Sequence, residues 1–399
     1  MQYRKMGSLD WEVSALGFGC MRLPARRFSL MGADLEESKR IIRYGIDRGI
    51  NYIDTAWPYH LGESEKVVGE TLKDGYREKV KLVTKLPMFL VHRTADFERF
   101  LSVQLDRLQT DHIDIYLFHA LNAGTFQRSK QLGLFEKMEE AKRQGRIRHI
   151  GFSFHDTYPV FKEIIDYYDW DMAQIQYNYM DTCVQATTEG LEYAHSKGIA
   201  VVIMEPVKGG TLANPPAEAA EMIREAPVAR TPVDWALQFL WNKPEIATVL
   251  SGMSNMQQVV ENCDSADRSG IDSLSTEENQ VISQLAEVYQ RKILVPCTAC
   301  EYCMPCPHGV NIPQNFALLN NISIEQSMVR RLQTRRSYRK LTGRPAKLDL
   351  ENPNGNASIC INCGVCVEKC PQEINIPVEL EKVDAILGRR KSIENYDWV

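Results

Sequence analysis

The chain has 399 residues, of which 44% are hydrophobic and 25% are charged, as in folded globular proteins. This length is too great for one ordinary core and predicts two domains. A net charge of −5 excludes the strongly basic composition of nucleic-acid-binding proteins, and no apolar run of about 18 residues could span a membrane. The first residues lead into no apolar signal segment. We therefore expect a cytoplasmic protein without nucleic-acid or membrane partners.

Apolar strands alternate with amphipathic helices over residues 1–285. The expected strands cover residues 15–19, 52–56, 80–86, 113–119, 148–154, 172–177, 200–205 and 247–252. The expected helices cover residues 35–48, 63–73, 96–108, 134–144, 184–197 and 233–241. Eight strands separated by helices favour an α/β fold of the (β/α)8 TIM barrel type over an open, doubly wound sheet.

Three consecutive expected strands end in polar residues, which are Asp54, Lys85 and His119, and Tyr59 follows the first of them. In a barrel of parallel strands, the carboxyl ends form the face where chemistry takes place. A phenol has an intrinsic pKa of about 10, so a Tyr that donates a proton at neutral pH needs a neighbouring cation, here Lys85. Each residue alone would fit an ordinary surface or capping role. Three such residues at consecutive strand ends, with a Tyr in the loop after the first, predict a catalytic site.

This set resembles the catalytic tetrad of the aldo-keto reductases, carried here by Asp54-Thr55-Ala56 with Tyr59, by Thr84-Lys85 and by His119. The resemblance implies that a small carbonyl substrate is reduced by hydride from NAD(P)H. Tyr59 would be the general acid and Lys85 would lower its pKa, while Asp54 holds Lys85 and His119 orients the carbonyl. It also implies that residues 1–14 form a hairpin at the bottom of the barrel. The substrate pocket would be lined by Trp57, His60 and Phe89.

The same resemblance implies a nicotinamide cofactor site. It places the nicotinamide ribose against the turn after the first strand and the carboxamide against Ser153 and Gln174. The pyrophosphate would lie on the loop after the seventh strand, and the adenosine on residues 251–255 with Gln258 and Asn262. The residues are Gly19, Cys20, Met21, Asp54, Ser153, Gln174, Met204, Glu205, Pro206, Val207, Gly209, Ser251, Gly252, Met253, Ser254, Gln258 and Asn262.

Two positions depart from the family pattern. Met204 stands where many members stack an aromatic ring on the nicotinamide, and this difference could leave room for a wider flavin ring. Gly252 and Gln258 stand where members that prefer NADPH place Lys and Arg on the 2′-phosphate. NADH therefore fits at least as well as NADPH.

Eight of the 11 cysteines lie between Cys297 and Cys370, and such clustering in a reducing compartment indicates metal binding rather than disulfides. Each of two motifs has three cysteines two residues apart, followed by a fourth before Pro. The second motif has the spacing of bacterial ferredoxins, whose fourth cysteine binds the other cluster. This rule predicts two 4Fe–4S clusters, one held by Cys297, Cys300, Cys303 and Cys370 and the other by Cys360, Cys363, Cys366 and Cys306. The first motif is one residue short before Cys306, and tetrathiolate zinc is the alternative.

Residues 286–399 are therefore expected to form a smaller, mainly helical, ferredoxin-like domain. Between its motifs lies a basic segment, either a solvated linker or a docking surface for an acidic redox partner such as a ferredoxin or flavodoxin. Its cations are Arg330, Arg331, Arg335, Arg336, Arg339, Lys340, Arg344 and Lys347. Nicotinamide transfers two electrons and a cluster one, so coupling them requires a group such as a flavin. The alternatives to a carbonyl reductase are an electron-transfer protein that uses the barrel for docking, and a redox sensor.

Overall fold

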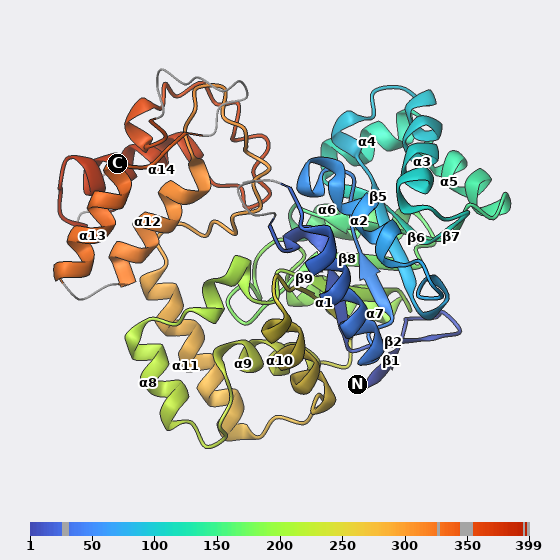
Figure 1. Cartoon of the computed structure of the whole chain (residues 1–399), viewed down its shortest axis with the longest axis horizontal. Helices are drawn as coiled ribbons and strands as arrows, with labels where there is room; N and C mark the ends of the chain where they lie inside the picture. The colour runs from blue at the N-terminus through green and yellow to red at the C-terminus, as the bar shows by residue number, and fades with distance from the viewer. Residues whose placement is uncertain (26–31, 325–327, 344–353, 394–395, 397–399) are drawn as a thin grey trace. The chain divides into compact units, whose positions relative to one another are not determined.

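The computed structural model describes residues 1–25, 32–324, 328–343, 354–393 and 396, and contains a closed barrel of parallel strands (Figure 1). The strands are β3 (Leu16–Gly19), β4 (Tyr52–Asp54), β5 (Lys81–Leu86), β6 (Ile113–Leu121), β7 (Ile147–Phe154), β8 (Met172–Gln176), β9 (Ala200–Met204) and β10 (Ile246–Gly252). Each pairs with the next strand along the chain, and β10 closes the ring by pairing in parallel with β3. The predicted (β/α)8 barrel is confirmed.

The expected strand ranges differ from the observed ones by at most two residues at either end. Every residue of β4 and every residue of β8 is buried, as is usual for strands covered on both faces.

Helices follow the strands along the chain. They are α1 (Leu35–Asp47), α2 (Glu63–Thr71), α3 (Ala95–Leu108), α4 (Ala123–Gln131), α5 (Leu134–Arg143), α6 (Tyr158–Tyr167), α7 (Thr187–Ser196), α8 (Ala217–Glu225), α9 (Pro232–Trp241), α10 (Met256–Asp267) and α11 (Thr276–Lys292). The helices named from the sequence did not include α4, α6, α8, α10 or α11. In α4 the buried residues are only Phe126 and Ser129. Its start is set by a capping box between Asn122 and Thr125 rather than by an apolar stripe.

A short N-terminal hairpin closes one end of the barrel interior. Its strands, β1 (Tyr3–Lys5) and β2 (Glu12–Ser14), pair antiparallel. Met6 and Val13 of this segment are fully buried and pack in one cluster with Tyr52 and Ile115 from the barrel strands. The hairpin implied by the family resemblance is present.

The C-terminal part is mainly helical, with α12 (Ile312–Ile324), α13 (Met328–Arg339) and α14 (Ile376–Val383), followed by a π-helical turn (Asp384–Gly388). It has its own core, which includes Phe316, Leu319 and Leu380. The two helices that follow the Cys-Pro motifs, α12 and α14, both begin at the Ile of an Asn-Ile-Pro sequence. The repeated Cys-Pro and Asn-Ile-Pro sequences are thus also a repeat of local structure.

By packing, the chain divides into two compact units, one of residues 1–206 and 233–275 and the other of residues 207–232 and 276–399. The expected boundary after residue 285 stays a prediction. Arg344 and Lys347 of the basic segment lie outside the described residues, as does the side chain of Arg330. Across the part of the chain that is described, no helix has the length and apolar character needed to cross a membrane.

Gly151 of β7 is expected to tolerate no side chain. A Cβ at this position would lie 2.5 Å from the carbonyl oxygen of Met172 on β8, which is backbone and cannot move aside. Gly151→Ala should lower the free energy of unfolding of the barrel by about 1–3 kcal/mol, the usual cost of overpacking. Urea denaturation followed by tryptophan fluorescence measures this change. In the control Gly124→Ala, the new Cβ meets only a side-chain oxygen at 3.4 Å. Equal losses in the two variants would contradict the prediction.

Candidate active site

The carboxyl ends of β4 and β5 bring Asp54 and Lys85 together. The strands are parallel neighbours, with Asp54 opposite Val83. Nζ of Lys85 donates hydrogen bonds to both carboxylate oxygens of Asp54, at 2.7 and 2.8 Å, and to the carbonyl of Thr55 at 2.8 Å. The two side chains are only 1% and 4% exposed. The result is an ion pair of fixed geometry, shielded from water.

Tyr59 and His119 complete the predicted tetrad around this pair. Tyr59 begins a short turn (Tyr59–Gly62) in which His60 has a positive φ of 50°. Nζ of Lys85 lies 3.5 Å from the Tyr59 hydroxyl. The rings of Tyr59 and His119 meet edge to face with their centroids 6.2 Å apart. The structure thus brings together the four predicted residues, three from consecutive strands and Tyr59 from the loop after the first.

Burial governs the protonation of these groups. It lowers the pKa of Lys85 and raises the pKa of Asp54, while the attraction between the two charges opposes both shifts. Burial, and then the charge of Lys85, also lower the pKa of His119 well below its usual range. The imidazole is therefore neutral at pH 7. It can hold a substrate oxygen by a hydrogen bond without acting as the proton source.

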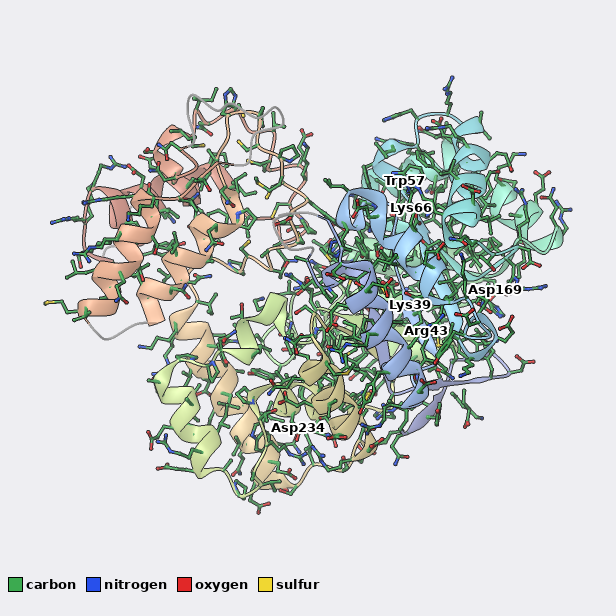
Figure 2. All side chains as sticks on the ribbon, viewed as in Figure 1. Lys39, Arg43, Trp57, Lys66, Asp169 and Asp234 are labelled. Atoms are coloured by element: carbon green, nitrogen blue, oxygen red, sulfur yellow. The ribbon has the colours of Figure 1, made fainter. Side chains whose placement is uncertain are left out.

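Of the aromatic residues predicted to line the substrate pocket, Phe89 lies at the tetrad. Its ring centroid is 6.2 Å from that of His119, and the side chain is 50% exposed. Trp57, labelled in Figure 2, is covered by the guanidinium of Arg107, 3.8 Å above its ring. His60 accepts a hydrogen bond at 3.0 Å from a backbone N–H of the segment after β3. Phe89 is thus available to a substrate, whereas Trp57 and His60 are engaged in packing.

The predicted carboxamide-binding pair lies on neighbouring strands, with Ser153 of β7 opposite Gln174 of β8. Ser153 Oγ accepts a hydrogen bond from the Ala120 N–H at 2.8 Å. Gln174 Oε1 is buried and has no hydrogen-bond partner among the described residues, and its Nε2 lies 3.8 Å from the sulfur of Met204. A buried acceptor without a partner is costly unless a ligand satisfies it. This oxygen fits the amide group of a nicotinamide.

The predicted adenosine-binding residues form two pairs after β10. Nδ2 of Asn262 donates to Ser251 Oγ at 2.9 Å, and the Ser254 N–H donates to Gln258 Oε1 at 2.8 Å. These bonds fix the polar groups at the start of α10, where a ribose or adenine could replace one partner. The amide of Gln258 carries no charge that could pair with a phosphate.

The turn after β3 contributes mainly backbone. Cys20 is buried, and its carbonyl accepts a hydrogen bond from Ser64 Oγ at 2.9 Å. Gly19 pairs with Asp54 in the barrel register, so Gly19, Cys20 and Met21 follow directly from the strand beside the tetrad. Met253, after β10, is fully buried.

The predicted pyrophosphate loop follows β9. Its backbone is left-handed at three residues, with φ of 59° at Glu205, 48° at Lys208 and 63° at Gly209. Buried Asn178 donates to the Glu205 carbonyl at 3.1 Å and so holds the start of the loop, which continues through Pro206 and Val207. Backbone of alternating handedness can turn several N–H groups toward one anion, as a phosphate requires.

The clustered cysteines form the two groups that the crossover rule predicts. Cys297, Cys300, Cys303 and Cys370 line one small cavity with apolar residues such as Phe316. Burial, and then repulsion from other thiols including Cys300, Cys297 and Cys370, raise the pKa of Cys303. In the second group, burial raises the pKa of Cys366 to about 11, with further contributions from Cys360, Cys306 and Cys363. Despite the shortened spacing, Cys306 lies with the second triplet.

Within the described ranges, no three His, Cys, Asp or Glu side chains converge closely enough to hold a single metal ion.

Comparison with known protein families agrees with this geometry. Residues 15–287 match the model of the aldo/keto reductase family, which is more than half of the chain. The chain belongs to the aldo-keto reductase family. Residues 296–376 match a 4Fe-4S dicluster domain, so this aldo-keto reductase carries a C-terminal iron–sulfur domain, as predicted.

Individual relatives support the same assignment. An uncharacterized oxidoreductase of Bacillus subtilis (strain 168) is 28% identical over 297 residues, which are 67% of this chain and 91% of that protein. The NADH-specific methylglyoxal reductase of Escherichia coli (strain K12) is 30% identical over 181 residues, or 41% of this chain and 54% of that protein. The solved holo form of an aldo-keto reductase from Bacillus halodurans shares 30% identity and a TM-score of 0.60, covering 71% of this chain and 96% of its own. The protein is an oxidoreductase of the aldo-keto reductase type.

A buried network behind this site was not predicted from the sequence. Glu65 of α2 is fully buried and accepts hydrogen bonds from Thr84 Oγ1 at 2.7 Å and Arg107 at 3.1 Å. Gln104 donates to the carbonyl of Lys85 at 3.1 Å and also contacts Glu65. The network fixes the end of β5 that carries Lys85. The available signal was an acidic residue on the inner face of a helix, where a charge is stable only when paired.

The second missed residue is Arg22, in the turn after β3. The carbon atoms of its side chain lie 3.4–3.6 Å from where a Cβ of Gly252 would stand. Because Gly252 has no side chain, Arg22 can pass over the end of β10. A cation thus lies beside Gly252, where the family resemblance showed none. Only the tertiary structure brings these two segments together.

The neutral state of His119 should appear in the pH dependence of stability. The unfolded chain takes up a proton on this side chain near the ordinary pKa of 6.5, whereas the folded chain does not. Stability is therefore lost as pH falls below about 6.5, at up to about 1.4 kcal/mol per pH unit. His119→Gln removes this contribution, so the stability of the wild type relative to the variant should decrease from about pH 7.5 to about pH 5.5. Urea denaturation at both pH values measures it, and a constant difference would show that His119 is charged when folded.

Proposed function

We propose that the barrel reduces a small carbonyl compound, an aldehyde or a ketone, with NAD(P)H as the hydride donor. The observation that carries this proposal is the buried Lys85–Asp54 pair with the Tyr59 hydroxyl 3.5 Å from Lys85 Nζ. An ammonium beside a phenol stabilises the phenolate that remains after the proton has left. The arrangement therefore suits Tyr59 to general acid catalysis.

Each residue of the tetrad then has one role. Tyr59 donates its proton to the carbonyl oxygen, and Lys85 stabilises the resulting phenolate. Asp54 holds the ammonium in place through two hydrogen bonds. Neutral His119 donates a hydrogen bond that orients the same oxygen. When bound, the reduced nicotinamide supplies the hydride.

Several residues predicted from the sequence would hold the nicotinamide cofactor. The unpartnered Gln174 Oε1 would accept the carboxamide N–H, with Ser153 beside it. We propose that NADH serves at least as well as NADPH, because Gln258 offers no cation to a 2′-phosphate and is engaged with Ser254. The E. coli relative is named as NADH-specific, which agrees with this choice. Arg22, whose side chain passes Gly252, is a cation that could modify the preference.

We further propose that the cysteines hold two 4Fe–4S clusters, with the ligand sets given above, and that these transfer electrons. Four cysteine side chains that line one cavity can bind an iron–sulfur cluster as thiolates. When bound, a cluster exchanges one electron at a time. Exchange with a nicotinamide needs a group that handles one and two electrons, such as a flavin. Flavin released on denaturation of anaerobically purified protein would identify it.

The electron carrier that would serve these clusters is acidic. Residues 327–348 contain no Asp or Glu. A groove of about 500 Å³ between α12 and α13 is lined by Gln314 and Leu318 on one side and by Arg336 and Lys340 on the other. Further described cations of this segment are Arg331, Arg335 and Arg339. Such a surface attracts a carrier of opposite charge, for example a ferredoxin or flavodoxin.

Tyr59→Phe should lower kcat by about 10²–10⁴-fold, the usual contribution of a positioned proton donor. NADH affinity should be retained, because the hydroxyl makes no contact assigned to the cofactor. Stopped-flow reduction of an aldehyde and fluorescence titration with NADH measure the two quantities. The control Tyr193→Phe, in α7, should keep wild-type turnover. Full activity of Tyr59→Phe would show that another group donates the proton.

Arg336→Glu combined with Lys340→Glu should slow reduction of the clusters by an acidic carrier at least tenfold. Since steering between charges weakens with salt, the wild-type rate should itself fall as ionic strength rises. Lys39→Glu on α1 combined with Lys66→Glu on α2, both labelled in Figure 2, is the control for the change in net charge. Rates that depend neither on salt nor on the two substitutions would leave this surface without a role in docking.

A further inference from the structure

The segment after β9 is built into the iron–sulfur unit. Residues 207–232, which leave the barrel at the predicted pyrophosphate loop, belong by their packing to the C-terminal compact unit. The Tyr289 hydroxyl of α11 donates to the carbonyl of Leu212 at 3.2 Å. Arg230 and Glu278 form an ion pair at 2.7 Å, in which both side chains are largely buried. The loop is thus held at both ends by the part of the chain that leads to the clusters.

Within this unit, Gly209 lies directly against Thr298. A Cβ at Gly209 would stand 2.2 Å from the carbonyl oxygen of Thr298 and 2.8 Å from its carbonyl carbon. Both atoms are backbone, so neither can turn away. Thr298 is 2% exposed, and Lys208 beside Gly209 is also 2% exposed. Two buried backbone segments therefore touch, one from the predicted cofactor loop and one from the cysteine region.

Thr298 belongs to the turn between Cys297 and Cys300, the first two predicted ligands of one cluster. The N–H of Ala299 donates to the sulfur of Cys297 at 3.4 Å, and Ala299 itself is left-handed with φ of 52°. Such a turn depends on where its two sulfur atoms are held. Cluster ligation therefore fixes the backbone against which Gly209 packs.

We propose that the Cys297–Cys300 turn is a positioning element of the cofactor site, so that the loop at Gly209 binds the cofactor tightly only when the first cluster is assembled. This inference rests on the proposed function of the loop. Its physical basis is conformational entropy: a loop with several left-handed residues is ordered only if its surroundings hold it, and without that support the cost of ordering falls on cofactor binding.

The first test removes the one predicted ligand of this cluster that lies outside the 297–303 segment. In Cys370→Ser holoprotein prepared without oxygen, iron and sulfide analysis should show loss of the first cluster. Fluorescence titration should show NADH affinity at least tenfold weaker. The KM for NADH should rise with little change in kcat at saturating NADH. Cys363→Ser, which removes a predicted ligand of the second cluster, should keep NADH affinity within about twofold of the wild type.

The second test leaves the clusters intact and changes the contact alone. Gly209→Ala should weaken NADH binding at least tenfold while iron content and the cluster absorption spectrum stay at wild-type levels. Its matched control is Gly210→Ala. Gly210 also has a positive φ, of 96°, but a Cβ there would meet nothing within 4 Å, so this variant carries backbone strain without the collision. It should lose clearly less affinity than Gly209→Ala.

The outcomes separate the two proposals. Wild-type NADH affinity in a Cys370→Ser protein that lacks the first cluster, or equal losses in Gly209→Ala and Gly210→Ala, would overturn the positioning role and leave carbonyl reduction untouched. Equal losses in Cys370→Ser and Cys363→Ser would overturn it as well, because the effect would then be general. Wild-type holoprotein that binds neither NADH nor NADPH would overturn the proposed function itself, and the inference with it.

Discussion

The ion pair between Lys85 and Asp54 is the interaction on which the catalytic end of the barrel depends. Burying either charge alone would cost several kcal/mol, and removing one partner would leave the other uncompensated. The surroundings meet this constraint in detail. Two carboxylate oxygens and the carbonyl of Thr55 surround the ammonium, and the network of Glu65 and Gln104 holds the strand from behind. The chemistry that we propose uses this fixed cation to stabilise the phenolate of Tyr59.

The same burial assigns different work to neighbouring groups. It keeps His119 neutral, so that the imidazole can orient a substrate oxygen while Tyr59 remains the proton donor. It also leaves Gln174 Oε1 without a hydrogen-bond partner among the described residues, so that a ligand can donate a hydrogen bond to it. Both effects come from closing the barrel around polar side chains, because the same groups at a wet surface would titrate and hydrogen-bond as they do in water.

The compact unit that contains the cysteines also includes residues 207–232, which follow β9. The segment that follows β9 packs with α11 and with the turn between Cys297 and Cys300, so one stretch of chain serves both the proposed cofactor site and the cluster unit. In a free barrel this segment would be an ordinary loop. Here its conformation is tied to residues almost one hundred positions later in the sequence, which gives cluster assembly a means to act on cofactor binding.

Several parts of this description were predictable because they depend on local pattern. The barrel strands are short, mainly apolar segments, so their ranges were located to within two residues, and Asp54, Lys85 and His119 were found because each lies at or near the carboxyl end of such a segment. The cysteine groups follow from fixed spacing, including Cys306 with its shortened interval. Helix α4 was not located, because its start depends on the capping bonds of Asn122 and Thr125 and it has no apolar stripe.

The sequence by itself determined the fold class, the tetrad and the two cysteine motifs, since each is written in residue type and spacing along a short stretch. Only the tertiary structure decided which distant segments meet: Arg22 on Gly252, Glu65 behind Lys85, and Thr298 on Gly209. The physical reason is that a close approach depends on how the chain closes around its core. Two of these contacts are made at glycines, Gly209 and Gly252. A glycine in a sequence does not tell which backbone or side chain will occupy the space that a side chain would have filled.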